Sequence, residues 1–134
     1  MRYMIMVKAD ASYEAGQPPS MEMMNAIGKL SEEMMRKGVM VETGGLLPSS
    51  KGAIVRVDSR KFTVTDGPFA EAKELVGGYA IVEAASKAEA IELTKQFLQV
   101  HVDVLGDSYA GECEIRQMEG PFGPGVVNCP TVQG

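Results

Sequence analysis

The chain has 134 residues, with 18 acidic against 13 basic side chains and a formal net charge of −5 at pH 7. Hydrophobic residues make up 45% and charged residues 23%, which is typical of one globular domain and excludes a disordered or fibrous chain. The acidic balance argues against direct binding to nucleic acid, because a negative protein repels the phosphate backbone.

The first regular pattern covers residues 2–8, which we expect to form a strand. Its residues alternate between two apolar sets, with Tyr3, Ile5 and Val7 on one side and Met4 and Met6 on the other. Both faces of this strand are therefore expected to be buried. The five apolar residues before Lys8 are too few for a signal-peptide core or a membrane span.

Two cysteines, Cys113 and Cys129, lack the paired spacing of a disulfide framework or a zinc site. No metal-ligand spacing, phosphate-binding glycine loop or nucleophile elbow is recognisable. We therefore expect no metal and no cofactor, no membrane association, and a cytoplasmic location by default.

A polar loop at residues 16–19 leads to a helix that should begin after Ser20, a good N-cap, and end at Gly38. Its apolar side chains recur at helical spacing: Met23, Ile27, Leu30 and Met34. We interpret these methionines as core filling, with a soft, adaptable binding surface as the alternative.

Residues 39–43 are expected to form a second strand that ends at Gly44 and Gly45. Residues 53–57 and 61–65 alternate like the arms of a hairpin joined by residues 58–60. The basic side chains Lys51, Arg56, Arg60 and Lys61 surround Asp58, and we interpret them as a solvated hairpin, not a phosphate site. Residues 76–83 are expected to form another strand, with a bulge near Gly77 and Gly78.

A second helix should follow Ser86, which forms a capping-box spacing with Glu89, and run to about Leu105. Residues 113–118 alternate as a final strand. The expected domain is residues 1–119, and residues 120–134 form a tail rich in glycine and proline without any period.

This order of elements predicts an α+β fold of the ferredoxin-like βαββαβ type with an inserted β-hairpin. In that fold both helices cover one face of the sheet and the other face stays bare. The apolar Met4 and Met6 would lie on the bare face, so we expect a second copy of the chain to cover it in a homodimer.

Residues 64–74, VTDGPFAEAKE, with Gly77, Gly78 and Tyr79 after them, resemble the signature of the YCII-related family in its Asp-Gly-Pro-Phe (DGPF) branch. The resemblance extends from the opening strand to about Met118 and implies a dimeric α/β barrel of ferredoxin-like protomers. In YCII itself a His and an Asp are suggested as an active-site pair, with the His in the first helix. This sequence has no His there, so the pair cannot be transferred.

Asp66 and His101 are the candidate catalytic residues, and Asp66, Phe69 and Tyr79 are the candidate ligand contacts. Two interpretations of Asp66 stay open, a structural turn residue or a site residue. The usual donor in such a turn is the backbone N–H two residues on, and it is missing here because Pro68 has no N–H. The carboxylate therefore needs the N–H of Phe69, a basic side chain or a ligand. His101 is the one histidine and the natural acid/base group, or else an ordinary residue near a helix end.

Two functions are therefore considered. The first is binding of a small organic molecule in a cleft, with an enzymatic reaction left open. The second is a non-catalytic accessory or regulatory protein with a protein partner in transcription control. The second is the alternative, and it rests on the resemblance, since similar proteins are often encoded beside extracytoplasmic-function sigma factors.

Overall fold

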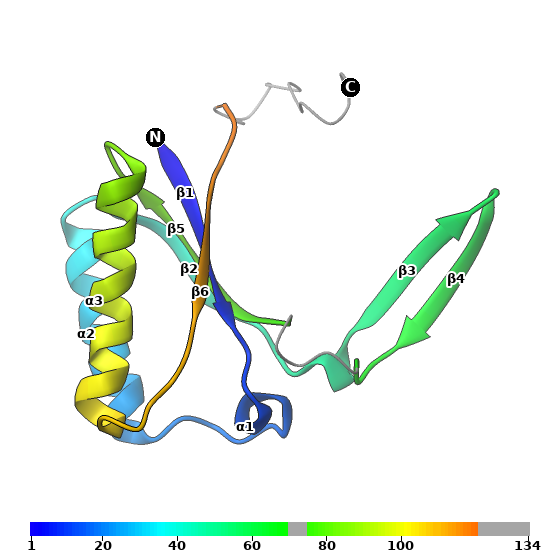
Figure 1. Ribbon diagram of the computed structural model, residues 1–134, viewed down its shortest axis with the longest axis horizontal. Helices are drawn as coiled ribbons and strands as arrows, with labels where there is room; N and C mark the ends of the chain where they lie inside the picture. The colour runs from blue at the N-terminus through cyan, green and yellow to red at the C-terminus, as the bar shows by residue number, and fades with distance from the viewer. Residues whose placement is uncertain (70–74, 121–134) are drawn as a thin grey trace.

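A four-stranded antiparallel sheet with two helices on one face forms the centre of the molecule (Figure 1). The computed structural model describes residues 1–69 and 75–120. The sheet order is β2-β5-β1-β6, with β1 at Arg2–Lys8, β2 at Met40–Gly45, β5 at Val76–Glu83 and β6 at Cys113–Gln117. The helices on the sheet are α2 (Met21–Arg36) and α3 (Lys87–Leu105). This order confirms the predicted ferredoxin-like α+β fold.

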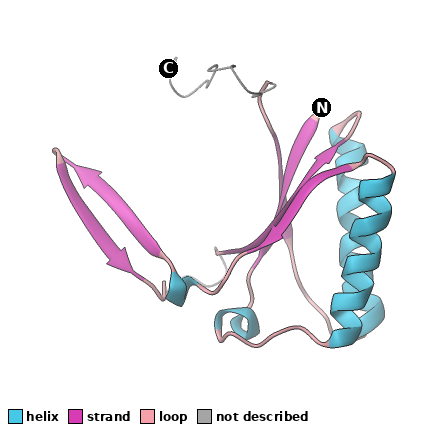
Figure 2. Cartoon of the chain, turned by 180° about the vertical axis from the view of Figure 1, so that it is seen from behind, coloured by secondary structure: helices cyan, strands magenta, loops and turns pink. Residues whose placement is uncertain are grey.

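Two insertions extend this frame. A short helix, α1 (Ala11–Glu14), follows β1, and a 3-10 turn, η1 (Ser49–Lys51), precedes a separate hairpin of β3 (Ala53–Asp58) and β4 (Lys61–Asp66). The hairpin projects on the side of the sheet opposite α2 and α3, as two opposite views show (Figures 1 and 2). It contributes no strand to the central sheet.

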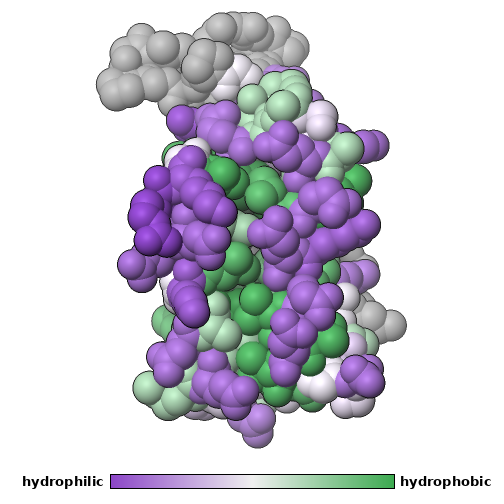
Figure 3. Space-filling model, turned by 90° about the vertical axis from the view of Figure 1, so that its left-hand side faces the viewer, coloured by the Kyte–Doolittle hydropathy of each residue, from purple (hydrophilic) through white to green (hydrophobic). Residues whose placement is uncertain are grey.

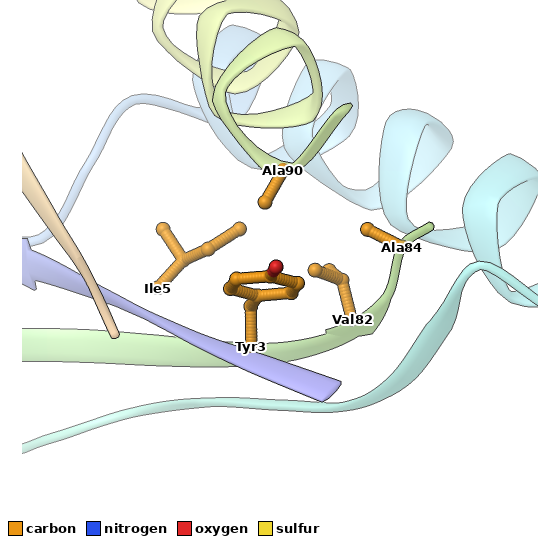
Figure 4. Close-up of a cluster of buried hydrophobic side chains, with 5 residues drawn as sticks. All are labelled: Tyr3, Ile5, Val82, Ala84 and Ala90. Carbon is orange, nitrogen blue, oxygen red and sulfur yellow. The ribbon is translucent and has the colours of Figure 1, made fainter. Parts of the chain in front are cut away.

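The core lies between the sheet and the helices. Its buried side chains are Tyr3, Ile5, Val82, Ala84 and Ala90, and the Tyr3 ring lies at the centre of the group, under Ala90 of α3 (Figure 4). In the β1–β5 register Tyr3 faces Val82 and Ile5 faces Ala80. Strand alternation therefore directs these residues to the helices and their neighbours Met4, Met6, Tyr79 and Ile81 to the other face.

Both long helices begin as the sequence predicts. The Ser20 hydroxyl accepts from the Met23 N–H at 3.1 Å, and the Ser86 hydroxyl accepts from the Glu89 N–H at 3.2 Å. Each satisfies an N–H group that has no partner within the helix. Met23 and Met34 are buried, which confirms their interpretation as core residues.

Two local predictions differ from the structure, and one short helix was missed. The strand expected to stop before Gly44 continues to Gly45. A glycine at position 44 leaves room for the Tyr79 ring, because a Cβ there would lie 3.0 Å from the Tyr79 Cε1 atom. The hairpin connection has two residues, Ser59 and Arg60, both with positive φ, as a tight type I′ turn requires. Helix α1 was not predicted, because four residues are too few to show a helical period.

The predicted bulge of β5 is present. The β1–β5 register shifts between Val7 and Lys8, and Gly77 is the extra residue. Residues 121–134 of the predicted tail, with Cys129, lie outside the described residues, as do residues 70–74 of the motif. Across the described ranges, every helix is too short or too polar to cross a membrane.

Candidate functional site

The Asp-Gly-Pro-Phe sequence forms a turn at the base of the hairpin. Asp66 ends β4, and the peptide bond between Gly67 and Pro68 is cis. The Gly67 N–H donates to the Gly52 carbonyl at 3.0 Å, and a Cβ on Gly67 would lie only 1.7 Å from the Ser49 carbonyl oxygen. Only glycine permits this close approach of two backbone segments. We call residues 66–69 the DGPF turn.

Hydrogen bonds tie the DGPF turn to helix α1 through Ser49. The Phe69 N–H donates to Ser49 Oγ at 3.0 Å, and the Ser49 hydroxyl donates to Glu14 Oε2 at 2.5 Å. Glu14 Oε1 accepts from the Ser49 N–H at 2.9 Å. One carboxylate thus holds both the hydroxyl and the backbone of Ser49, and charge-assisted bonds of this kind are stronger than neutral ones. We call these three residues the turn brace.

The other end of α1 connects the brace to the sheet. Asp10 caps the helix by accepting from the Tyr13 N–H at 2.7 Å, and the Ala9 N–H donates to the Leu75 carbonyl at 2.8 Å. A Cβ on Gly77 would lie 3.3 Å from Ala9 Cα and 3.4 Å from the Tyr13 ring. The β5 bulge therefore lets α1 lie close against the sheet, and through α1 it positions the turn.

Asp66 is exposed at the end of β4. The possibility that its carboxylate accepts from the Phe69 N–H is wrong, because that N–H donates to Ser49. Among residues 1–69 and 75–120, no hydrogen bond or ion pair to the Asp66 side chain is found. In this part of the chain, the fold makes no use of the Asp66 charge.

Tyr79 lies on the face of the sheet away from the helices. Its hydroxyl donates to a Glu42 carboxylate oxygen on the neighbouring strand. This hydrogen bond, followed by burial and the negative charge of Glu42, raises the pKa of Tyr79 above its ordinary value. Tyr79 and Glu42 form a polar pair beside the apolar Met4, Met6 and Ile81.

His101 lies in the last turns of α3, with its ring packed between two aromatic rings. Its Nδ1 is 3.0 Å from the Phe97 carbonyl oxygen. Because a carbonyl oxygen only accepts, Nδ1 carries a proton and donates, and Nε2 is the ring nitrogen that takes no part in this bond. The ring stacks on Tyr109 with centroids 5.1 Å apart and an interplanar angle of 28°. Asp103 accepts from the Gln99 amide, and among the described residues no hydrogen bond or ion pair joins it to His101.

Tyr109 stacks on His101, and Cys113 packs against the core cluster. Burial, then the charges of Cys113 and Asp10, raises the pKa of Tyr109. Burial and the neighbouring Glu112 raise the pKa of the Cys113 thiol to about 11. Because the thiolate is the reactive form, the Cys113 thiol is poorly reactive at neutral pH.

The candidate residues do not form one site within a single chain. Asp66 ends β4, which lies on the side of the sheet opposite α3, whereas His101 belongs to α3 (Figure 1). Tyr79 lies on the sheet face that the helices leave open. Asp66 and Phe69 share the DGPF turn. In the described ranges, no group of three or more His, Cys, Asp or Glu side chains is placed to hold a metal ion.

Sequence reasoning missed Glu14 and Ser49, on which the turn brace depends. They are 35 residues apart, and Ser49 is 20 residues from Phe69. Pairings at that separation leave no local period in a single sequence. The available signal was Gly67, whose missing side chain indicates that another part of the chain comes close.

These features define a ferredoxin-like α+β domain with an inserted hairpin and a braced DGPF turn. A family model described as YCII-related domain matches residues 1–100. The chain therefore belongs to the YCII-related family. The match includes the DGPF turn and Tyr79 and ends one residue before His101.

One relative comes from Rhizobium meliloti (strain 1021) and is described as uncharacterized protein R00369. It is 28% identical over 72 residues, which cover 54% of this chain and 58% of the relative. The alignment thus spans somewhat more than half the length of each protein.

Proposed function

We propose that this protein binds a small organic molecule at the DGPF turn, with the Asp66 carboxylate as the polar contact and Phe69 as its neighbour on the turn. The supporting observation is the contrast between the two ends of the turn. Phe69 is fixed by Ser49 and Glu14, while Asp66 carries an exposed charge that the described fold does not use. A rigid turn loses little entropy on binding. Its exposed carboxylate favours a ligand with a cationic or hydrogen-donating group.

The open face of the sheet supports the proposal that the protein acts as a homodimer. Met4, Met6 and Ile81 alternate with the buried core residues, and among the described elements both long helices lie on the other side of the sheet (Figure 1). Paired charges flank this apolar strip, with Arg2 bonded to Glu83 and Lys8 bonded to Glu114. An apolar centre with a polar rim is the usual anatomy of a protein interface. Packing of two such sheets would form the dimeric α/β barrel, with the Tyr79–Glu42 pairs inside.

A thermal-shift screen of the purified protein against a metabolite library tests the binding proposal. A ligand that binds only the folded state raises the melting temperature by mass action. We expect reproducible stabilisation by one chemical class with a basic or donor group. If no class stabilises the protein at millimolar concentration, the binding proposal is wrong. Any reaction on the bound ligand is a further step of the same proposal.

A second candidate function, an accessory or regulatory role in sigma-factor-dependent transcription, is favoured by the outer surface of the helices. Met21, Met24 and Met35 of α2 are exposed, and hydrophobic side chains appear along the middle of the helical face between polar ones (Figure 3). Methionine-rich surfaces adapt to protein partners. Calorimetric titration with an extracytoplasmic-function sigma factor tests this role, and Met24→Glu should abolish the signal. Absence of binding by the wild-type chain contradicts it.

A further inference from the structure

The β3–β4 hairpin, which we call the arm, has one apolar face that stays exposed in the described part of the chain. In the arm register Val55 pairs with Val64 and Val57 pairs with Phe62, so all four side chains lie on the same face. They are 60–74% exposed. The opposite face carries polar residues, including Arg56 opposite Thr63.

A two-stranded ribbon with this pattern needs a covering surface. An isolated hairpin is at best marginally stable in water, and further strands or a packed surface are needed to hold it. The arm makes no strand pairing with the central sheet. The four exposed apolar side chains are adjacent on the ribbon, and contiguous patches of this kind mark interaction sites.

We propose that the apolar face of the arm docks onto a second copy of this chain, on the side of that copy where its sheet is open. The inference rests on the homodimer of the proposed function. The arm and the open face project to the same side of the molecule (Figures 1 and 2). A second copy seated on Met4, Met6 and Ile81 therefore also meets the arm, and twofold symmetry makes the contact reciprocal.

The charge distribution favours the same occupant. The arm carries three basic side chains, Arg56, Arg60 and Lys61, against two acidic ones, Asp58 and Asp66, for a net charge of +1. The whole chain carries −5, so the remainder carries −6. A basic arm is thus attracted to the acidic body of a second copy, which steers and orients the association.

Photo-cross-linking of the full chain tests the docking. The photoreactive p-benzoylphenylalanine replaces Phe62 on the apolar face or, as the control, Thr63 on the polar face. Copies of different isotope composition are mixed, so that mass spectrometry separates cross-links between copies from those within one. We expect position 62 to react with tryptic peptides 3–8 or 74–87 of the other copy, which carry the open-face residues Met4, Met6, Tyr79 and Ile81.

Cross-links from position 62 confined to its own chain, or directed to α2 or α3 of the other copy, overturn the docking. The same holds if position 63 reacts between copies as strongly as position 62.

Sedimentation separates this inference from the homodimer itself. Phe62→Glu should raise the dimer dissociation constant about tenfold or more, because the contact would place a charge on an apolar surface. Thr63→Glu makes the same charge change on the other face, so it should raise the constant much less than Phe62→Glu does. A dimer that both variants leave intact overturns the arm docking alone. A wild-type chain that sediments only as a 14.4 kDa monomer at micromolar concentration overturns both the docking and the homodimer.

Discussion

The Ser49 hydroxyl accepts a hydrogen bond from the Phe69 N–H at 3.0 Å, although the two residues are 20 positions apart in the sequence. The same hydroxyl donates to Glu14. One side chain therefore satisfies the turn's backbone and connects it to helix α1. The Ser49 group is partly buried, so water replaces these bonds incompletely when they are lost.

Replacement of Ser49 by alanine should destabilise the protein by about 1–2 kcal/mol, because it leaves the Phe69 N–H and the Glu14 carboxylate without their partner. Urea denaturation monitored by circular dichroism measures the change. Ser50→Ala is the matched control, since Ser50 is the exposed neighbour and its substitution should stay within about 0.5 kcal/mol. Equal effects of the two substitutions would contradict the brace.

The close approach of Gly67 to Ser49 gives a second prediction. Gly67→Ala places a Cβ 1.7 Å from the Ser49 carbonyl oxygen, so the backbone must shift, at a cost of about 1–3 kcal/mol. Gly28→Ala is the control, because a Cβ on Gly28 meets nothing within 4 Å and alanine favours the helix by about 0.5–1 kcal/mol. Thermal melting should therefore move in opposite directions for the two variants. A neutral Gly67→Ala would show that the two segments are not held in contact.

The sequence predicted the frame of this fold better than the contacts between its parts. The alternation of Tyr3 and Ile5 with Met4 and Met6 assigned both sheet faces, since side-chain direction in a strand is a local property. The helix starts after Ser20 and Ser86 could also be predicted, because an N-cap depends only on the cap residue and its near neighbours in the sequence. The turn brace depends on pairings between distant segments, and the separation of Asp66 from His101 depends on where the hairpin projects. Neither follows from periodicity, so the sequence supplied candidate residues but not their grouping.

Cys113 gives a prediction for pH dependence. Burial raises the thiol's pKa from 9.0 to about 11, so the folded chain holds this proton more tightly than the unfolded chain. Its contribution to stability is complete below about pH 9 and declines as pH rises to about 11. At pH 8 the native protein should therefore alkylate slowly at Cys113, and protein unfolded in urea should alkylate quickly. Mass spectrometry of the tryptic peptide 96–116 measures both rates. Equal rates would show that the thiol is not protected by the fold.

The open sheet face predicts the effect of a charge at Met6. Met6→Asp should shift the protein from dimer to monomer, because the dimer would bury an unpaired carboxylate. Met6→Leu keeps the volume and apolar character and should preserve the dimer. Sedimentation velocity measures the oligomeric state, and circular dichroism verifies that each variant folds. A folded Met6→Asp variant that still sediments as a dimer would move the interface away from this face.

Asp66→Asn distinguishes a turn residue from a ligand contact, because it keeps the shape of the side chain and removes the charge. If Asp66 has only a structural role, asparagine should cost at most about 1–1.5 kcal/mol and leave ligand stabilisation unchanged. As a ligand contact, the carboxylate is exposed and unused by the described fold, so we expect near-normal stability and loss of the thermal shift that the wild type shows with its ligand. Asp58→Asn is the control, since Asp58 is an exposed acidic residue of the same hairpin and accepts only from Ser59 in the described structure. It removes the same charge without touching the DGPF turn and should bind normally. An Asp66→Asn protein that loses stability but still binds would place Asp66 in the turn alone.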